Sequence, residues 1–446
     1  MRETVAIVKK RSITLRESVF IVAVVAMTFF VVPHPAAAGV DEVWMDGPVQ
    51  PGGDPQVPDV AVDRWGRSVV VWRAFSNSGG DNHDIWLRRF DADGNALMDP
   101  VMVNTTIDNG QNHPRVAVSG DGSFLVVWQS SEDLGGVLRP MVRSQAFDAN
   151  ANPVGTEQLL STLEPALPQD IDADVAALRG GGYAVVWKSD NTSGTDTNDS
   201  IQARRVAANG VAQGGQFQVN STVGAGETDP AVTELSNGGF LVLWAGPELH
   251  GRRFSANGAP VGDDFQINTS TDGSEAEPDA TIGWDNQILV VWKDTEGPGD
   301  DREIMARVFS ETLAPQGDDF FINTIIDGVQ DNPRASQWGP GGFFVAWESS
   351  GSVGNDSSGR SIQGRIVRAE DHFAGPQFQI NAWIEGDQQS PGVGGGFFGS
   401  VGVVWKSQSN SATSDNVITG RMTDWCDIFC DDFEEGDFIR WSSTQP

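Results

Sequence analysis

A short apolar segment that ends in tryptophan recurs along the whole chain. It appears seven times, and successive tryptophans are spaced 48 to 59 positions apart. A glycine-rich turn precedes most copies, and before it lies a short segment that usually opens with proline, a residue that costs no sheet hydrogen bond at a strand start. The seven segments are Val69–Trp72, Leu125–Trp128, Ala184–Trp187, Leu241–Trp244, Leu289–Trp292, Phe344–Trp347 and Val401–Trp405.

Two further strands are expected in each repeat. A polar loop follows the tryptophan and leads to a third strand such as Ile85–Phe90, after which comes a turn rich in Asp, Asn and Gly, as hairpins require. The fourth strand reads apolar, polar, apolar, Asn, as in Phe265–Asn268. Four-stranded antiparallel units of this spacing pack around an axis with Trp and Phe between neighbouring sheets. The pattern therefore predicts an all-β protein, with a seven-bladed β-propeller over residues 39–423.

The two ends of the repeat region test whether the propeller is closed. The seventh repeat has a third strand at Val417–Met422 but lacks the fourth one. Near the start of the chain, Glu42–Asp46 matches Asp264–Asn268 position by position. We expect residues 42–46 to form the outer strand of the last blade, which closes the ring and removes a free sheet edge.

Residues 1–38 have the pattern of an export signal. Basic Lys9, Lys10 and Arg11 precede an uncharged apolar run over 19–32, and small residues follow as far as Ala38. That run is shorter than the roughly twenty residues that a membrane-spanning helix needs, and no later segment is apolar enough to span a bilayer. We expect cleavage after Ala38 and a mature protein that is secreted or at the cell surface, with no integral membrane segment.

The composition is strongly acidic. The net charge is −32, and removal of five basic and two acidic residues with the signal makes it about −35. Such a surface repels nucleic acid and anionic lipid and favours cationic partners. The only cysteines are Cys426 and Cys430, so disulfides cannot hold the propeller together and packing must do so. Whether these two cysteines are bridged stays open, and we expect a monomer.

The repeat elements, among them Gly-Gly-Phe-x-Val-x-Trp and Phe-x-Ile-Asn-Thr, resemble propeller-type repeats of large secreted bacterial proteins, which often stand beside repeat-in-toxin calcium-binding modules. The resemblance covers residues 42–423. It implies an extracellular, adhesive or ligand-binding role and transfers no catalytic residue. No glycine-rich calcium nonapeptide array is present, which weakens any transfer of calcium binding.

The last segment, residues 424–446, is an acidic tail that carries the cysteine pair. Its run from Cys426 to Gly436, with Trp441 beyond, resembles a C-terminal module of exported Gram-negative proteins with the core Ile-Phe-x-Asp-Gly-Phe-Glu-x-Gly, although Asp432 stands where Gly is usual. The resemblance implies Gram-negative export, with the periplasm as a further destination, and a sorting role for the tail. The alternative is a solvated acidic tail.

Common catalytic motifs are missing from the sequence. It has no His-Glu-x-x-His zinc motif, no Gly-x-Ser-x-Gly elbow and no phosphate-binding glycine loop. A sialidase needs converging arginines and a tyrosine nucleophile, but the only tyrosine, Tyr183, lies within a second strand and is expected in the core. We assign no catalytic residue. Six arginines occupy one equivalent strand position and are expected to be structural, stacking on a Trp or pairing with an acid: Arg88, Arg204, Arg252, Arg307, Arg365 and Arg421.

Acidic loops are the best functional candidate. In a four-stranded blade, the loops from strand two to three and from strand four to the next blade emerge on one face, and both sets are acid-rich here. Oxygen-rich loops suit calcium, which takes six to eight oxygen ligands, yet none has the spacing of a dedicated calcium loop. Solvated loops are therefore the alternative, and metal ligands stay unassigned. In the fourth repeat, a very short loop between Trp244 and His250 should leave a notch in this face. The candidate ligand-binding residues are Asp81, Asp84, Asp108, Asp196, Asp199, Glu248, His250, Asp272, Asp300, Asp301, Asp327 and Asp331.

These observations predict a secreted, non-enzymatic binding or adhesion module. Its acidic face would take a cationic, protein or carbohydrate ligand and no nucleic acid, with Ca²⁺ as the only cofactor to consider. The alternative is a propeller glycoside hydrolase or sialidase-like enzyme with dispersed acids on the same face. The sequence does not name the ligand.

Overall fold

The computed structural model is all-β, and its unit Ala38–Pro446 contains seven sheets of four antiparallel strands each. The expected seven-bladed propeller is confirmed. No helix in the described part of the chain is long and apolar enough to cross a membrane. The unit Met1–Ala37 and the acidic tail lie outside the described residues, so the predicted signal and cysteine pair do too. The structure describes residues 42–46, 54–75, 83–162, 169–190, 199–222, 226–270, 273–295, 302–326, 328–339, 342–369, 371, 374–396, 399–408 and 416–423.

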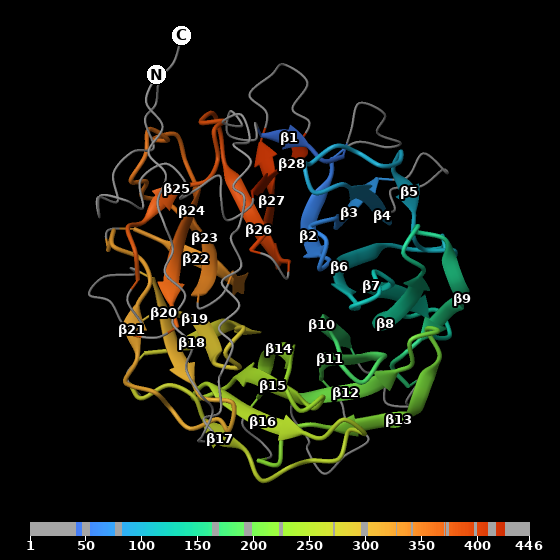
Figure 1. Ribbon diagram of the computed structural model, residues 1–446. Helices are drawn as coiled ribbons and strands as arrows, with labels where there is room; N and C mark the ends of the chain where they lie inside the picture. Colours follow the sequence, from blue (N-terminus) through green and yellow to red (C-terminus); the bar gives the residue numbers. More distant parts are fainter. Residues whose placement is uncertain are drawn as a thin grey trace, which may run out of the picture. The chain divides into compact units, whose positions relative to one another are not determined.

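The sheets follow one another around a common axis in chain order (Figure 1). The first blade comprises β2 (Gln56–Val62), β3 (Ser68–Phe75), β4 (His83–Phe90) and β5 (Val101–Met102). The second has β6 (Gln111–Val118), β7 (Phe124–Asp133), β8 (Leu138–Phe147) and β9 (Pro153–Leu159). The third has β10 (Asp170–Ala177), β11 (Tyr183–Ser189), β12 (Ser200–Val206) and β13 (Ala212–Gln218).

The remaining blades repeat this plan. The fourth has β14 (Thr228–Glu234), β15 (Phe240–Ala245), β16 (His250–Phe254) and β17 (Phe265–Gln266). The fifth has β18 (Glu275–Ile282), β19 (Ile288–Asp294), β20 (Glu303–Phe309) and β21 (Phe320–Phe321). The sixth has β22 (Gln330–Trp338), β23 (Gly342–Ser349), β24 (Ser361–Arg368) and β25 (Phe378–Gln379). The seventh has β26 (Gln388–Gly395), β27 (Val401–Gln408), β28 (Asn416–Thr423) and the N-terminal β1 (Val43–Trp44).

The N-terminal strand closes the ring, as the sequence predicted. In β1, Val43 pairs with Gly420 and Trp44 with Thr419. The flanking residues repeat the contacts of their counterparts in the other blades. The Glu42 carboxylate accepts hydrogen bonds from the amides of Ala382 and Trp383 at 2.8 and 2.9 Å, as Asp264 does from two amides of the previous blade. The chain's first strand therefore completes the blade that the chain's last strands begin.

Apolar side chains between neighbouring blades form the core. Each of the seven hydrophobic clusters is shared by two adjacent blades, because inward and outward positions of a strand face opposite sheets. All seven repeat tryptophans are at most 2% exposed, which confirms their expected place in the core. Full burial of such a side chain contributes about 1.5–3 kcal/mol, so the repeat itself supplies the stability of the ring.

The six repeated arginines join blades, which confirms their structural role. Arg307 donates from Nη1 to the Ile267 carbonyl of the previous blade at 2.6 Å and from Nε to the Gly317 carbonyl at 3.0 Å. Arg204, Arg252 and Arg365 make the same pair of bonds. Their main partners are thus backbone carbonyls. The rings that Arg252 and Arg307 contact belong to Phe rather than to the expected Trp, and both arginines also pair with an acid, as expected.

The seventh blade meets its neighbours through glycines on β26. A Cβ on Gly394 would lie 2.8 Å from the Val60 carbonyl oxygen of the first blade. A Cβ on Gly395 would lie 2.3 Å from the Gln337 carbonyl oxygen of the sixth. Real Cβ atoms do not approach backbone this closely, so β26 has room for no side chain at these two positions.

Candidate functional site at the inner strands

The inner strands carry the same unusual backbone feature in every blade. Each has a β-bulge near its start, where one residue adopts a left-handed conformation with φ between 48° and 55°. For residues other than glycine this conformation costs about 1–2 kcal/mol. Bulges of this kind re-aim a side chain and recur next to functional sites. We call these residues the bulge ring: Val57, His113, Asp172, Asp229, Glu277, Asn332 and Ser390.

The bulge ring lies on one face of the propeller. The start of each inner strand pairs with the end of the second strand, for example Thr228 with Ala245, so it lies beside the loop from the second to the third strand. We call this side the loop face; it is the side on which the acidic loops were expected. Each inner strand also contacts the inner strands of the neighbouring blades, so the ring surrounds the propeller axis (Figure 1).

Acids occupy this ring in three adjacent blades only. In the third, fourth and fifth blades the bulge residue is acidic, and the residue two positions before it is acidic as well. The other four blades have neutral residues at both positions, with Pro55, Gln111, Gln330 and Gln388 at the earlier one. The three earlier acids are at most 3% exposed, whereas the three bulge acids are partly exposed. We call these six residues the acidic sector: Asp170, Asp172, Glu227, Asp229, Glu275 and Glu277.

Two of the bulge acids have no basic partner within ion-pair distance in the described part of the chain. Lys293, the residue after the fifth repeat tryptophan, pairs with Glu277. Lys188, at the equivalent position of the third blade, pairs with Asp199 rather than with Asp172. In the fourth blade this position is Ala245, so no cation stands beside Asp229 there.

The pKa values in the sector show that nearby basic charges compensate for burial only in part. Burial raises the pKa of Asp172, although the charges of Lys188 and Arg115 act against it. Burial, with the charges of Asp172 and Glu277, raises the pKa of Asp229, although the charge of Lys293 acts against it. Burial, helped by the charge of Asp190, raises the pKa of Asp170 to about 6. Burial, with the charges of Asp294 and Glu248, raises that of Glu275 to about 7. The ionised sector is therefore electrostatically unfavourable without a cation.

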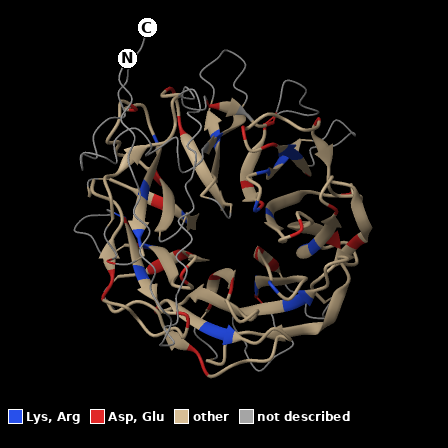
Figure 2. Cartoon of the chain, in the orientation of Figure 1, with Lys and Arg blue, Asp and Glu red and all other residues tan. Residues whose placement is uncertain are grey.

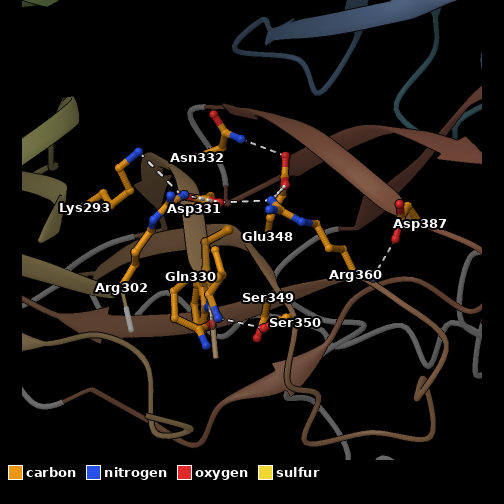
Figure 3. Close-up of polar contacts among 12 residues, drawn as sticks. Lys293, Arg302, Gln330, Asp331, Asn332, Glu348, Ser349, Ser350, Arg360 and Asp387 are labelled. Atoms are coloured by element: carbon orange, nitrogen blue, oxygen red, sulfur yellow. Dashed lines mark hydrogen bonds and ion pairs between the residues drawn. The ribbon is translucent and has the colours of Figure 1, made fainter. Parts of the chain in front are cut away.

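A compensated network flanks the sector in the fifth and sixth blades. Figure 3 shows Lys293, Arg302 and Arg360 gathered around Asp331. The nearest distances from Asp331 are 2.8 Å to Arg302 and 3.0 Å to Arg360, and Arg360 also pairs with buried Glu348. Burial would raise the pKa of Asp331, but the hydrogen bond from Arg302 and the three basic charges hold it below its usual value. Because its charges are balanced, this network is a less suitable cation site than the sector beside it.

A second row of charges lies two residues further along the inner strands. Asp59, Asp174 and Asp279 each accept a hydrogen bond from a backbone amide of the next blade at 2.8–2.9 Å. Arg115 and Arg334 stand at the equivalent position of the second and sixth blades. Burial, with the charge of Asp279, raises the pKa of Asp174 to about 6. These carboxylates tie the inner strands together below the bulge ring.

The structure separates the candidate residues chosen from the sequence. Asp84 and Glu248 accept hydrogen bonds from the repeated asparagines Asn104 and Asn268, and Asp84 is only 1% exposed. His250 stacks on Trp244 at 6.1 Å between ring centroids. Asp199 and Asp331 are paired as described, and Asp108 is exposed. The other six lie outside the described residues: Asp81, Asp196, Asp272, Asp300, Asp301 and Asp327.

No metal site can be built from the residues that are described. Among them, no group of three or more His, Cys, Asp or Glu side chains is placed to hold an ion. Tyr183 is fully buried, and its hydroxyl lies 3.0 Å from the Ser119 hydroxyl, so it is in the core as expected. Figure 2 shows many of the basic residues on the strands and many acids at strand ends and loops.

The sequence analysis missed the acidic sector, because none of its six residues is among the candidate ligand-binding residues. The signal that identifies them is present in the repeat: aligning the starts of the inner strands shows an acid-x-acid pattern in three successive copies, followed by Pro230 and Pro278 in the fourth and fifth blades and by Ala173 in the third.

Comparison with known proteins gives the fold. No family model and no curated protein matches the sequence. Among solved structures, a protein of unknown function from Dyadobacter fermentans has 15% identity and a TM-score of 0.50, with 75% of this chain and 99% of that one covered. An ulvan lyase from a new polysaccharide lyase family has 7% identity and a TM-score of 0.53, with 85% and 95% covered. An intramolecular trans-sialidase from Ruminococcus gnavus has 8% identity and a TM-score of 0.49, with 89% and 99% covered. At such identities the likeness concerns the propeller alone, a fold that hosts unrelated functions.

Proposed function

We propose that this protein is a secreted, non-enzymatic binding module whose acidic sector takes up a cationic side chain, lysine or arginine, of a protein partner. The observation that carries the proposal is the pair of acids repeated in the third, fourth and fifth blades and in no other blade. Equivalent positions of a repeat protein are expected to carry similar residues, because the same packing recurs in each repeat. A different residue type confined to three neighbouring blades therefore indicates a function. The export pattern of residues 1–38 supports the secreted location.

The energetics of the sector favour a cation. A buried carboxylate without a partner pays for its lost hydration, and a basic group at hydrogen-bond distance offsets that cost. Asp172 and Asp229 are partly exposed, burial raises their pKa values, and neither makes an ion pair within the described residues, so a basic group from a partner would offset this cost. Charge-assisted hydrogen bonds from an ammonium or guanidinium group of the ligand would stabilise these carboxylates, as the Lys293 ammonium stabilises the Glu277 carboxylate. Binding should strengthen as pH rises, because the raised pKa values mean that protons compete with the ligand.

The partner should carry an accessible basic residue. The net charge of −32 extends attraction for basic partners beyond the site and should make association fast and sensitive to salt. Calcium remains an optional part of the proposal and rests on loop acids such as Asp196, Asp300 and Asp301. A calorimetric calcium titration with a chelator control tests it: no heat and no shift in melting temperature removes the metal.

A double substitution tests the site. Asp172→Asn with Asp229→Asn keeps the shape and tolerates the left-handed backbone, because Asn adopts positive φ readily. Binding of a lysine-rich peptide, measured by fluorescence anisotropy, should weaken about a hundredfold, or roughly tenfold for each lost contact of about 1.4 kcal/mol. The matched control removes two exposed acids on turns of the opposite face, Asp93→Asn with Asp285→Asn, and should change affinity less than about threefold. Equal losses in both pairs would mean that only net charge matters and would overturn the site.

A propeller glycosidase is the alternative. Its chemistry needs two carboxyl groups, one of them protonated at working pH, and the raised pKa values of Asp170 and Glu275 are the observation in its favour. The tyrosine nucleophile of a sialidase has no counterpart, because the only tyrosine is buried. Chromogenic glycosides and a glycan array separate the two functions, since turnover of any glycoside by the purified protein would replace the binding proposal.

A further inference from the structure

An exposed tryptophan between two arginines marks the face opposite the loop face. Trp65, on the turn between β2 and β3, is 47% exposed. The guanidinium carbons of Arg64 and Arg67 lie 4.2 and 4.8 Å from a Trp65 ring centroid, within cation–π range. The equivalent turn of the second blade has small and acidic residues, Gly120-Asp121-Gly122. We call Arg64, Trp65 and Arg67 the Trp65 patch.

The patch offers positive charge on an acidic protein. Arg67 is neutralised by Asp63 at 2.7 Å, and Asp63 is almost fully buried. Arg64 is exposed and forms no ion pair with any described residue. Asp121 on the neighbouring turn accepts hydrogen bonds from the hydroxyl and amide of Ser123, and these bonds, helped by the charge of Arg64, lower its pKa. An exposed ring flanked by an exposed guanidinium suits a segment that carries both aromatic and acidic side chains.

The described chain ends beside this patch. The last strand, β28, ends at Thr423, which pairs with Val401 at the start of β27 and therefore lies on the same face as the β2–β3 turn. Met422 packs with Val62 in one hydrophobic cluster. A Cβ on Gly66 would lie 3.0 Å from the Ser400 hydroxyl of the seventh blade. The chain thus leaves the propeller next to the turn that carries Trp65.

The segment that follows has the complementary chemistry. Residues 424–446 contain seven acids and one arginine, with aromatic residues between the acids, as in Asp424-Trp425 and Asp431-Asp432-Phe433-Glu434. An extended chain covers about 3.3 Å per residue, so the first eight residues after Thr423 can reach well past the patch. A segment tethered this close acts at a millimolar effective concentration, which makes a weak contact sufficient.

We propose that the acidic tail, residues 424–446, docks on the Trp65 patch of its own propeller. Aromatic side chains of the tail stack against Trp65, and its carboxylates pair with Arg64.

Hydrogen exchange on the mature full-length chain tests the docking. Amides of residues 424–446 should exchange about tenfold more slowly in the wild type than in Trp65→Ala or Arg64→Glu. The matched control is Trp284→Ala, which removes a tryptophan that is 40% exposed on the equivalent turn of the fifth blade, and tail exchange should be unchanged by it. Exchange in β2 and β3 reports whether Trp65→Ala has disturbed the fold.

Two results would overturn the inference. The first is a wild-type tail that exchanges at the rate of an unstructured peptide. The second is equal loss of protection in the Trp65 and Trp284 variants, which would mean that the tail responds to general loss of exposed rings. Arg64→Glu decides the case if Trp65→Ala perturbs β2, because Arg64 is exposed and belongs to no hydrophobic cluster.

Discussion

Closure of the ring by β1 can be tested with a single side chain. Met45, just beyond β1, is fully buried and packs in the cluster that joins the seventh and first blades, with Trp72 and Ile418 among its members. Its amide also donates to the Ile418 carbonyl at 2.8 Å. Truncation of a buried Met to Ala typically costs about 2–5 kcal/mol through lost burial and the cavity left behind. We therefore expect Met45→Ala to lower the free energy of unfolding by about 3 kcal/mol.

Met102 provides the matched control. It lies in β5, the outer strand of the first blade, which like β1 has two residues, but its side chain is 41% exposed. Met102→Ala should change stability by no more than about 0.5 kcal/mol. Urea unfolding followed by tryptophan fluorescence compares the two, since a lower midpoint with an unchanged slope reports lost stability. If the two variants have the same midpoint, the N-terminal segment is not part of the seventh blade in solution and the closed ring is refuted.

Three further predictions concern the acidic sector, a glycine of the seventh blade and one of the repeated arginines. Glu275→Gln should stabilise the protein at pH 8 and leave its stability nearly unchanged at pH 4. The folded-state pKa of Glu275, about 7, is above the ordinary 4.5, so the wild type loses stability as pH rises through this window. Melting temperatures of the two proteins across this pH range measure the difference. Gly395→Ala should destabilise by about 3 kcal/mol or prevent folding, whereas Gly180→Ala, whose Cβ would meet no atom within 4 Å, should stay within about 0.5 kcal/mol by urea unfolding. Arg307→Lys keeps the charge but cannot reach both carbonyls, so it should cost about 1–3 kcal/mol; an unchanged melting temperature would contradict the interblade role.

The fold could be predicted from the sequence because its signals are repeated and local. The Trp-terminated segment, the Asn that ends the fourth strand and the glycine turns each recur once per blade, so every copy supports the others. The unmatched strand at Glu42–Asp46 was recognised for the same reason, since its pattern fits the position that the last repeat lacks.

The candidate site was harder to predict because it depends on conformation and burial. Residues before Pro favour extended backbone, so nothing indicated the left-handed conformation of Asp229 or Glu277. Asp84 and Glu248 look like loop acids, but they accept hydrogen bonds from the repeated asparagines. Glu275 is recognised as an exception only when the blades are aligned. The equivalent residues of three other blades, Gln111, Gln330 and Gln388, each accept a hydrogen bond from a tryptophan indole at 2.9–3.1 Å.

The pairing of β1 with β28 has a consequence for the order of assembly. Every other strand pair joins neighbours in the sequence, so each blade can form as soon as its own residues are available, whereas Val43 must wait for Gly420. Contacts of high sequence separation are slow to form because a long loop has to close first. Ring closure is therefore the last step of folding, and a partly synthesised chain necessarily presents an unpaired β-edge to its surroundings.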